Sequence, residues 1–173
     1  METQKAIRTR RTHKAFGTRP VDRKVLDELF ELARWAPNHH LTNPWRFRVI
    51  GPVAREALME LAEADARGAA AKLARAPTLV AVTAALRHED AREDREDLLA
   101  TAVAAYLVLL GAHARGLAGY WRTVPLLADP RARAILDTPG DEEPVALLYL
   151  GDPVQEQRVP ERAPLGDVVA YLP

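Results

Sequence analysis

The stretch LARWAPNHHLTNPWRFRVI, residues 32–50, joins a helical pattern to a strand pattern. Before it, apolar residues recur at the spacing of a helix that Pro37 would end: Val25, Leu26, Leu29, Phe30 and Ala33. After it, residues 46–51 alternate polar and apolar side chains, as a half-buried strand does. The connection holds two tryptophans, two histidines and two prolines, which is more than turn chemistry requires. The sequence therefore predicts a helix–strand unit whose loop does more than connect.

Composition limits the class of protein to which this unit belongs. The 173 residues suit one domain, residues 1–173, and 48% of them are hydrophobic, enough for a substantial core. The 24 basic and 24 acidic side chains cancel, so overall charge gives no reason to expect nucleic acid. The absence of cysteine excludes disulfide and thiolate chemistry. Without an apolar signal segment or a bilayer-length apolar stretch, we expect a cytoplasmic protein without a membrane span.

Helical and strand-like patterns alternate along the rest of the chain. Helices are expected over about residues 1–10, 23–36, 52–66, 69–75, 98–115 and 126–136. Strands are expected over residues 46–51, 78–84 and 145–150, with a short one after Gly116. Several strands are apolar on both faces, which fits a central sheet covered by helices.

A charged segment and an apolar segment follow one another in the middle of the chain. Residues 98–115 are apolar nearly all round, so this helix should be buried in a core or a dimer interface. The charge run RHEDAREDRED, residues 87–97, is best explained as a solvated loop leading into that helix, since acidic residues favour a helix N-terminus.

No motif in the sequence supplies a catalytic side chain. HExxH is absent, and the adjacent His39 and His40 point in different directions, so we expect no metal site. There is no GxSxG elbow and no P-loop, and GLAGYW lacks the glycine spacing of a dinucleotide fingerprint. If the protein is an enzyme, a cofactor carries the chemistry.

Two clusters could hold such a cofactor. RTRRTHK, residues 8–14, offers the forked donors, positive charge and hydroxyl that suit a phosphate monoester. Taken alone, this stretch is better explained as an exposed basic helix end, because basic runs are usually solvated. In the quoted loop, Trp35 and His39 could wall a flat aromatic ligand, or Trp35 could anchor the core and His39 cap a turn. Both explanations stay open, whereas Trp45 is best explained as a core residue.

Taken together, five segments resemble the flavin-dependent nitroreductase family, in its order and spacing. They are AIRTRRTHKAF (6–16), LARWAPNHHLTNPWRFRVI (32–50), RAPTLVAVTA (75–84), HARGLAGYWRT (113–123) and VALLYLGDP (145–153). The short length and YWRT resemble the small, compact branch of that family.

This resemblance implies a fold, a cofactor and a reaction. The implied fold is an α+β sandwich with a central mixed β-sheet flanked by helices, built as an intertwined homodimer. Two flavin mononucleotides (FMN) would lie at the subunit interface. The implied activity is a ping-pong oxidoreductase, in which NAD(P)H reduces FMN and the flavin reduces a nitroaromatic, quinone or similar acceptor.

The resemblance also implies site residues. Three should hold the FMN phosphate and ribityl chain: Arg10, Arg11 and Thr12. Five should lie at the flavin, with the sets coming from different subunits: Trp35, His39, Trp121, Arg122 and Thr123. Six should meet the nicotinamide nucleotide: Gly111, Ala112, His113, Ala114, Arg115 and Gly116. Many relatives carry a basic phosphate ligand near the C-terminus, for which Arg158, Arg162 and Arg122 are candidates.

Two alternatives remain at this stage. Relatives of this fold also remove halogens or fragment flavin, so a specialised flavin enzyme is possible. A small module that binds nucleic acid through its basic N-terminus is the third hypothesis. Charge balance and the lack of exposed aromatic stacking positions argue against that module.

Overall fold

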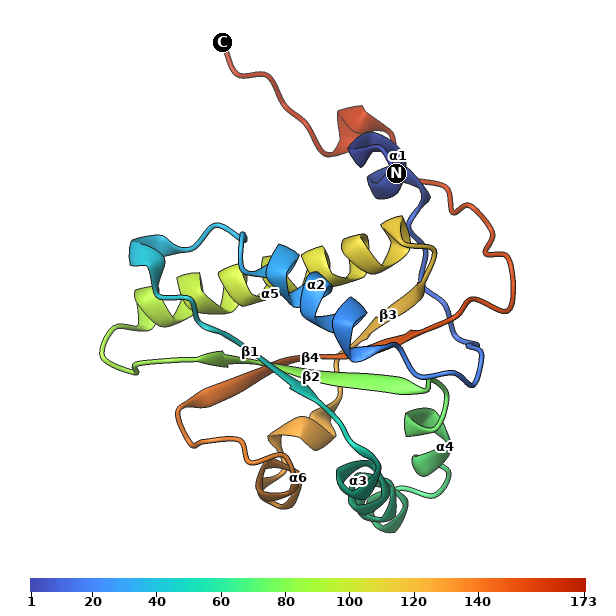
Figure 1. Cartoon of the computed structure of the whole chain (residues 1–173). Coiled ribbons are helices and arrows are strands. Elements are labelled where there is room, and N and C mark those ends of the chain that lie inside the picture. Colours follow the sequence, from blue (N-terminus) through green and yellow to red (C-terminus); the bar gives the residue numbers. More distant parts are fainter.

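The computed structural model describes residues 1–173 and is built around one four-stranded sheet (Figure 1). Its order is β1-β2-β4-β3, with β1 Trp45–Val49, β2 Thr78–Ala85, β3 Ala118–Arg122 and β4 Glu142–Gly151. The sequence predicts a mixed sheet, but all three strand pairs are antiparallel. Parallel pairing is confined to an isolated bridge between Thr12 and Gly119.

Helices cover both faces of this sheet, as expected for an α+β sandwich (Figure 1). One face carries α2 Arg23–Ala33 and α5 Ala91–Ala114, and the other carries α3 Pro52–Asp65, α4 Ala70–Leu73 and α6 Pro130–Ile135. The strands serve both layers because successive side chains point to opposite faces. In β2, Val80 and Val82 join the α2–α5 core, whereas Leu79 and Ala81 join the core under α3, α4 and α6. This double burial explains the continuous apolar runs in the sequence.

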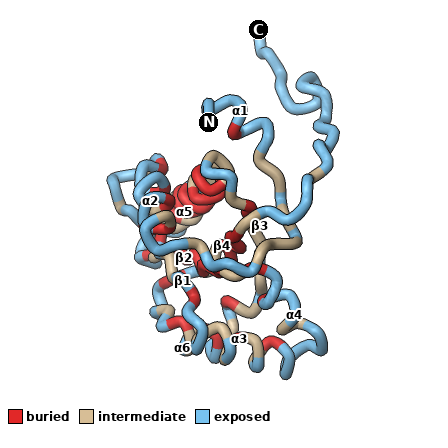
Figure 2. The backbone as a smooth tube through the Cα atoms, turned by 45° about the vertical axis from the view of Figure 1, so that its right-hand side comes forward, coloured by how far each residue is buried: buried red, intermediate tan, exposed pale blue.

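The two ends of the chain extend away from this body. α1, Thr3–Thr9, and the segment after Pro153 lie to one side of it, and most of both is exposed (Figure 2). Three short 3-10 turns complete the structure: η1 His39–Leu41, η2 Pro125–Ala128 and η3 Leu165–Asp167. The ends also carry large exposed apolar side chains: Ile7, Val154, Val159, Leu165, Val168, Tyr171 and Leu172.

α5 begins earlier than the sequence predicts. The charge run is not a loop throughout, because the helix starts at Ala91 and Asp90 caps it by accepting a hydrogen bond from the Arg92 amide at 2.7 Å. The extra turns make α5 long and apolar enough to cross a membrane, contrary to the expectation that no segment reaches that length. Half of that apolar window is buried inside this chain, where α5 packs on α2 and the sheet. Packing of α5 in the core therefore explains its apolar composition.

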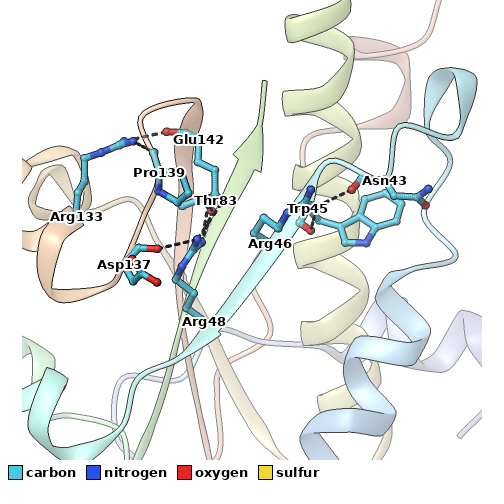
Figure 3. Close-up of polar contacts among 9 residues, drawn as sticks. All are labelled: Asn43, Trp45, Arg46, Arg48, Thr83, Arg133, Asp137, Pro139 and Glu142. Atoms are coloured by element: carbon cyan, nitrogen blue, oxygen red, sulfur yellow. Dashed lines mark hydrogen bonds and ion pairs between the residues drawn. The ribbon is translucent and has the colours of Figure 1, made fainter. Parts of the chain in front are cut away.

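A buried ion pair closes one end of the sheet (Figure 3). Arg48 of β1 donates to both carboxylate oxygens of Glu142 in β4, at 2.6 and 2.9 Å, and the Thr83 hydroxyl donates to the same carboxylate. Burial pushes the pKa of Glu142 upward, but the hydrogen bonds and positive charge of Arg48 outweigh it, so the pKa lies below its ordinary value. Arg133 holds the preceding turn by donating to the carbonyl oxygens of Glu142 and Pro139. This network fixes the strand ends far from the N-terminal basic residues.

Candidate functional site

The basic N-terminal segment lies along the edge of the sheet. β3 is the last strand in the sheet order, so one side of it is open for pairing. Thr12 pairs with Gly119 in a parallel bridge, and the His13 amide donates to the Gly119 carbonyl at 3.1 Å. The fold thereby places Arg10, Arg11 and Thr12 together, at the first residues of β3.

Positive charge in this segment is not neutralised by any acidic side chain. The Arg10 guanidinium lies 5.7 Å from the centre of the Tyr106 ring on α5, and Arg11 donates to the carbonyl oxygens of Arg8 and Arg10 at 2.7 and 2.8 Å. Neither arginine forms an ion pair, and Nε of Arg11 is buried without a hydrogen-bond partner. Burial, and then the charge of Arg10, lowers the pKa of His13 and of His113 below the ordinary histidine value. An anion would supply the missing partners.

A cavity of about 370 Å³ lies at the other end of β3, and we call it the β3 cavity. Its apolar lining comes from α3, α4 and η2: Ala62, Ala66, Leu73, Val124, Pro125 and Leu126. Its charged lining residues are Asp65, Lys72, Arg122 and Asp129. Arg131 engages both acids, at 2.9 and 2.7 Å, and holds the pKa of Asp129 at about 2. Lys72 and Arg122 are therefore the cations of this cavity without a carboxylate partner.

The sequence analysis missed Lys72. It is a single lysine in an alanine-rich segment, and no local motif marks it. It meets Arg122 only because α4 packs beside the end of β3. A lysine brought to a ligand by tertiary packing leaves no signal in a sequence pattern of the kind that revealed RTRRTHK.

The two ends of β3 carry cationic sites of different kinds on opposite faces of the sheet: the basic cluster contacts α5 at Tyr106 and His113, whereas the β3 cavity is lined from α3, α4 and η2. Gly119 and Arg122 are three residues apart, about 10 Å along a strand. An unneutralised basic cluster at one end suits a phosphate, and a largely apolar cavity with two cations at the other suits a ring with polar edges. Thr123, which follows β3, is exposed beside that end. The basic cluster thus fits the phosphate tail of a nucleotide-like ligand, and the β3 cavity separately fits a ring with polar edges.

Trp121 does not line the β3 cavity. It neighbours Arg122 in β3, so the two side chains point to opposite faces of the sheet. Trp121 packs, partly buried, against the α2–α5 core, while Arg122 donates to the Tyr149 hydroxyl at 3.1 Å on the other face. Arg122 therefore faces the β3 cavity, and Trp121 lies on the opposite face of the sheet.

Trp35 and His39 lie on a different part of the surface. Trp35 is 78% exposed and donates from Nε1 to Glu31 at 3.3 Å, which does not support a core role. Trp45 is buried, as predicted. His39 lines a groove with Leu99 of α5, whereas the N-terminal segment reaches α5 at His113, where Thr9 and the imidazole Nε2 are 2.8 Å apart.

These two contact points cannot share a ligand within one chain. Leu99 and His113 are fourteen residues apart, which is about 21 Å along a helix. His39 is therefore expected to meet the β3 edge on a second copy of the chain, and the exposed Trp35, four residues before it, is free to do the same. Their role at the flavin stays a prediction.

Residues 111–116 divide into packed and accessible positions. Gly111 and Ala112 are buried, and a Cβ at Gly111 would lie 2.8 Å from a Leu32 methyl carbon, so close packing of α2 on α5 explains this glycine. Arg115 pairs with Glu28 at 3.1 Å, and Gly116, with φ +80°, ends the helix. The predicted nucleotide contact therefore narrows to the side chains of His113 and Arg115 and the backbone near Gly116, with Ala114 between them.

A surface hollow of about 690 Å³ along α3 is not the candidate site. Its charged lining residues are Glu56, Glu60, Glu63 and Arg55, and Arg55 donates its hydrogen bonds to backbone carbonyl oxygens. Three carboxylates would repel a phosphate. The tail residues Arg158 and Arg162 form no ion pair and lie on the extended C-terminal segment, so their contact with a phosphate also stays a prediction.

Comparison with known proteins identifies the family of this chain. Residues 7–152 match the model of the Nitroreductase family, a range that runs from the end of α1 to the end of β4. The chain belongs to the nitroreductase family. Among relatives of this nitroreductase is a Bacillus subtilis protein provisionally named NAD(P)H nitroreductase YfhC, 26% identical over 93% of this chain and 89% of its own.

Solved structures share the fold over the whole length of this nitroreductase. A nitroreductase-like protein from Bacillus cereus superposes with a TM-score of 0.88, at 23% identity over 99% and 96% of the two chains. The FMN- and NADPH-dependent nitroreductase NfnB of a Sphigopyxis strain gives 0.80, at 19% identity over 99% of both. Iodotyrosine deiodinase bound to FMN and 3-iodo-L-tyrosine gives 0.79, at 18% identity over 98% of both. At these identities the likeness establishes the shared fold.

Proposed function

We propose that this nitroreductase is an FMN-dependent oxidoreductase that uses NAD(P)H to reduce nitroaromatics, quinones or similar acceptors by a ping-pong mechanism. The observation that carries the proposal is the unneutralised basic cluster that the Thr12–Gly119 bridge holds at the start of β3, with a second cationic site at the other end of that strand. Support comes from NfnB, described as FMN- and NADPH-dependent, and from the FMN-bound deiodinase. The absence of a catalytic side-chain motif agrees with chemistry carried by a cofactor.

Each end of β3 has a separate task in this proposal. Arg10, Arg11 and Thr12 hold the phosphate, where each charge-assisted hydrogen bond contributes about 1.5–3 kcal/mol. Lys72 and Arg122 face the ring from the β3 cavity, where positive charge stabilises negative charge that develops on a ligand. When bound, FMN supplies the acceptance of a hydride from NAD(P)H and its delivery to the acceptor. The chain supplies binding, orientation and electrostatics.

A homodimer completes the proposed site. Exposed apolar residues lie on α5, on the loop after α2 and on the C-terminal segment: Leu99, Val103, Trp35, Leu41, Val159, Val168 and Leu172. One chain leaves them uncovered, whereas a second copy could bury them. It would also bring Trp35 and His39 to the β3 edge of its partner. A cytoplasmic location remains part of the proposal.

Reductive dehalogenation is the second candidate, because the deiodinase has the same fold. That likeness concerns the fold, and nothing specific to the β3 cavity favours a halogenated substrate. Nucleic-acid binding is not proposed, because the basic segment is accounted for at the edge of the sheet.

Purified protein tests the proposal directly. We expect flavin absorbance at one FMN per chain, and steady-state oxidation of NADH or NADPH that depends on a nitroaromatic or quinone. Bound FMN without such turnover, but with loss of halide from a halogenated phenol, would favour the second candidate. Protein that does not bind added FMN would overturn both.

A further inference from the structure

The last acid of the charge run is buried in the core side of α5. Asp97 is 4% exposed, although the sequence places it in a segment expected to be solvated. Its neighbours on the buried face of the helix are small: Ala100, Thr101, Ala104 and Ala105. A carboxylate in such a place is costly unless it is hydrogen-bonded. The burial of the Asp97 carboxylate therefore calls for a hydrogen-bond partner.

The carboxylate forms one hydrogen bond, to the loop between α2 and β1. The Thr42 hydroxyl donates to Oδ1 of Asp97 at 2.5 Å, and no other side chain or amide of the protein bonds to this carboxylate. Thr42 lies in the 36–43 loop, between α2 and β1. The contact joins residues 55 apart in sequence and ties the loop to the longest helix of the fold.

Three residues of the 36–43 loop have backbone conformations that residues other than glycine disfavour. His40, Leu41 and Asn43 have φ of 50°, 54° and 48°, in the left-handed region that side chains disfavour. Within the loop, the Asn43 amide donates to the Asn38 side chain at 2.9 Å. Such strained conformations persist where the surroundings enforce them, and they concentrate at functional sites.

The side chains that this strained loop displays face outward. Leu41 is 76% exposed, and His39 lies in the groove beside α5 with its ring 3.8 Å from that of His40. An exposed leucine and a histidine on a braced loop suit contact with something outside the chain. If the protein has the proposed function, these two side chains would contact the electron acceptor bound at the flavin of the second copy.

We propose that Asp97 is a positioning residue: through Thr42 it fixes the 36–43 loop, and the loop sets the affinity for the electron acceptor. The inference rests on the proposed function, because the acceptor is defined there. The carboxylate touches neither acceptor nor cofactor; it acts through the threonine hydroxyl. Thr42 and Asp97 are accordingly one unit, and removing either releases the same loop.

Four substitutions test this unit. Thr42→Val removes the hydroxyl with little change of shape, and Thr42→Ser keeps it. Thr101→Val is the matched control, because the Thr101 hydroxyl is buried on the same helix one turn from Asp97 and has no hydrogen-bond partner. Asp97→Ala combined with Thr42→Val shows whether the two residues act together.

Three measurements on FMN-loaded protein report the outcome. For Thr42→Val we expect amide hydrogen exchange in residues 37–43 to accelerate about tenfold, the ratio that corresponds to 1.4 kcal/mol. We expect KM for a nitroaromatic to rise by about the same factor, while reduction of bound FMN by NAD(P)H under anaerobic conditions changes less than about twofold. Thr42→Ser and Thr101→Val should match the unaltered protein, and the double variant should match Thr42→Val.

Other outcomes overturn the proposal. Unchanged exchange in the 36–43 loop of Thr42→Val would show that Asp97 does not hold it. Faster exchange with an equal loss in both half-reactions would assign the contact to general stability, as would a Thr101→Val variant that loses as much. A failure of the proposed function is seen separately, as unaltered protein that lacks FMN or turnover.

Discussion

Arg122 at the end of β3 donates a hydrogen bond to the hydroxyl of Tyr149 in β4, at 3.1 Å. The Tyr149 ring is fully buried and lies 5.4 Å from the ring of Tyr120, so the hydroxyl is a rigid acceptor. This contact fixes the guanidinium at the wall of the β3 cavity and leaves its remaining donors for a ligand. A cation held in this way is pre-organised for charge stabilisation.

Arg122→Met should make bound FMN harder to reduce. Losing a cation beside the ring removes about 1.4–3 kcal/mol from the negatively charged reduced form, which lowers the midpoint potential by about 30–60 mV. Potentiometric titration measures this shift. Tyr149→Phe, which keeps the charge and removes the tether, should shift the potential less. An unaltered potential in Arg122→Met would mean that the guanidinium does not face the ring.

Arg10→Ala should weaken FMN binding without unfolding the protein. Arg10 forms no ion pair and stacks on Tyr106, so its charge is free for the phosphate. Losing a charge-assisted contact of about 1.5–3 kcal/mol raises Kd for FMN roughly 10- to 100-fold. Fluorescence titration measures Kd, and thermal unfolding of the apoprotein should stay within about 2 °C. Arg23→Ala, on the exposed start of α2, is the control and should leave Kd unchanged.

Much of this architecture is readable from sequence because local and tertiary preferences agree. Gly116 ends α5 as predicted, and β2 and β4 show their double burial as unbroken apolar runs. α2 is found where it is expected but ends at Ala33, a turn before Pro37. The predicted start of α5, near residue 98, is wrong because acidic residues suit the first turn of a helix as well as the loop before it.

The candidate site was only partly predictable for a different reason. Arg10, Arg11 and Thr12 are contiguous, so their cluster survives in the sequence. Lys72 and Arg122 converge through packing of α4 beside β3, and the strand register, which the sequence does not show, decides that Arg122 rather than Trp121 faces the cavity.

Leu99→Asp should disrupt the proposed homodimer. Leu99 is 60% exposed on α5 next to Val103, and a carboxylate there would be buried unpaired in an interface. We expect sedimentation to show a concentration-dependent shift toward monomer, together with loss of FMN, because the site needs both copies. Val53→Asp, at an 81% exposed position on α3, is the control and should remain dimeric. A Leu99→Asp protein that keeps its dimer and flavin would place the interface elsewhere.

Glu142→Gln should destabilise the fold in a pH-dependent way. Arg48 pairs with this carboxylate in a place where little solvent screens it, so breaking the pair leaves a partly buried guanidinium uncompensated, at a cost of about 2–3 kcal/mol at pH 7. The folded pKa of Glu142 lies below its unfolded value of about 4.3. The carboxylate's contribution is therefore complete above the unfolded pKa and is lost as pH falls through the folded pKa. Urea unfolding at pH 7 and at acid pH should show the gap between the two proteins narrowing as acid protonates the native side chain. Glu143→Gln changes the next residue of β4, which is exposed, and should leave the free energy of unfolding unchanged at both pH values. If Glu142→Gln remains equally destabilised in acid, the loss comes from packing and not from charge.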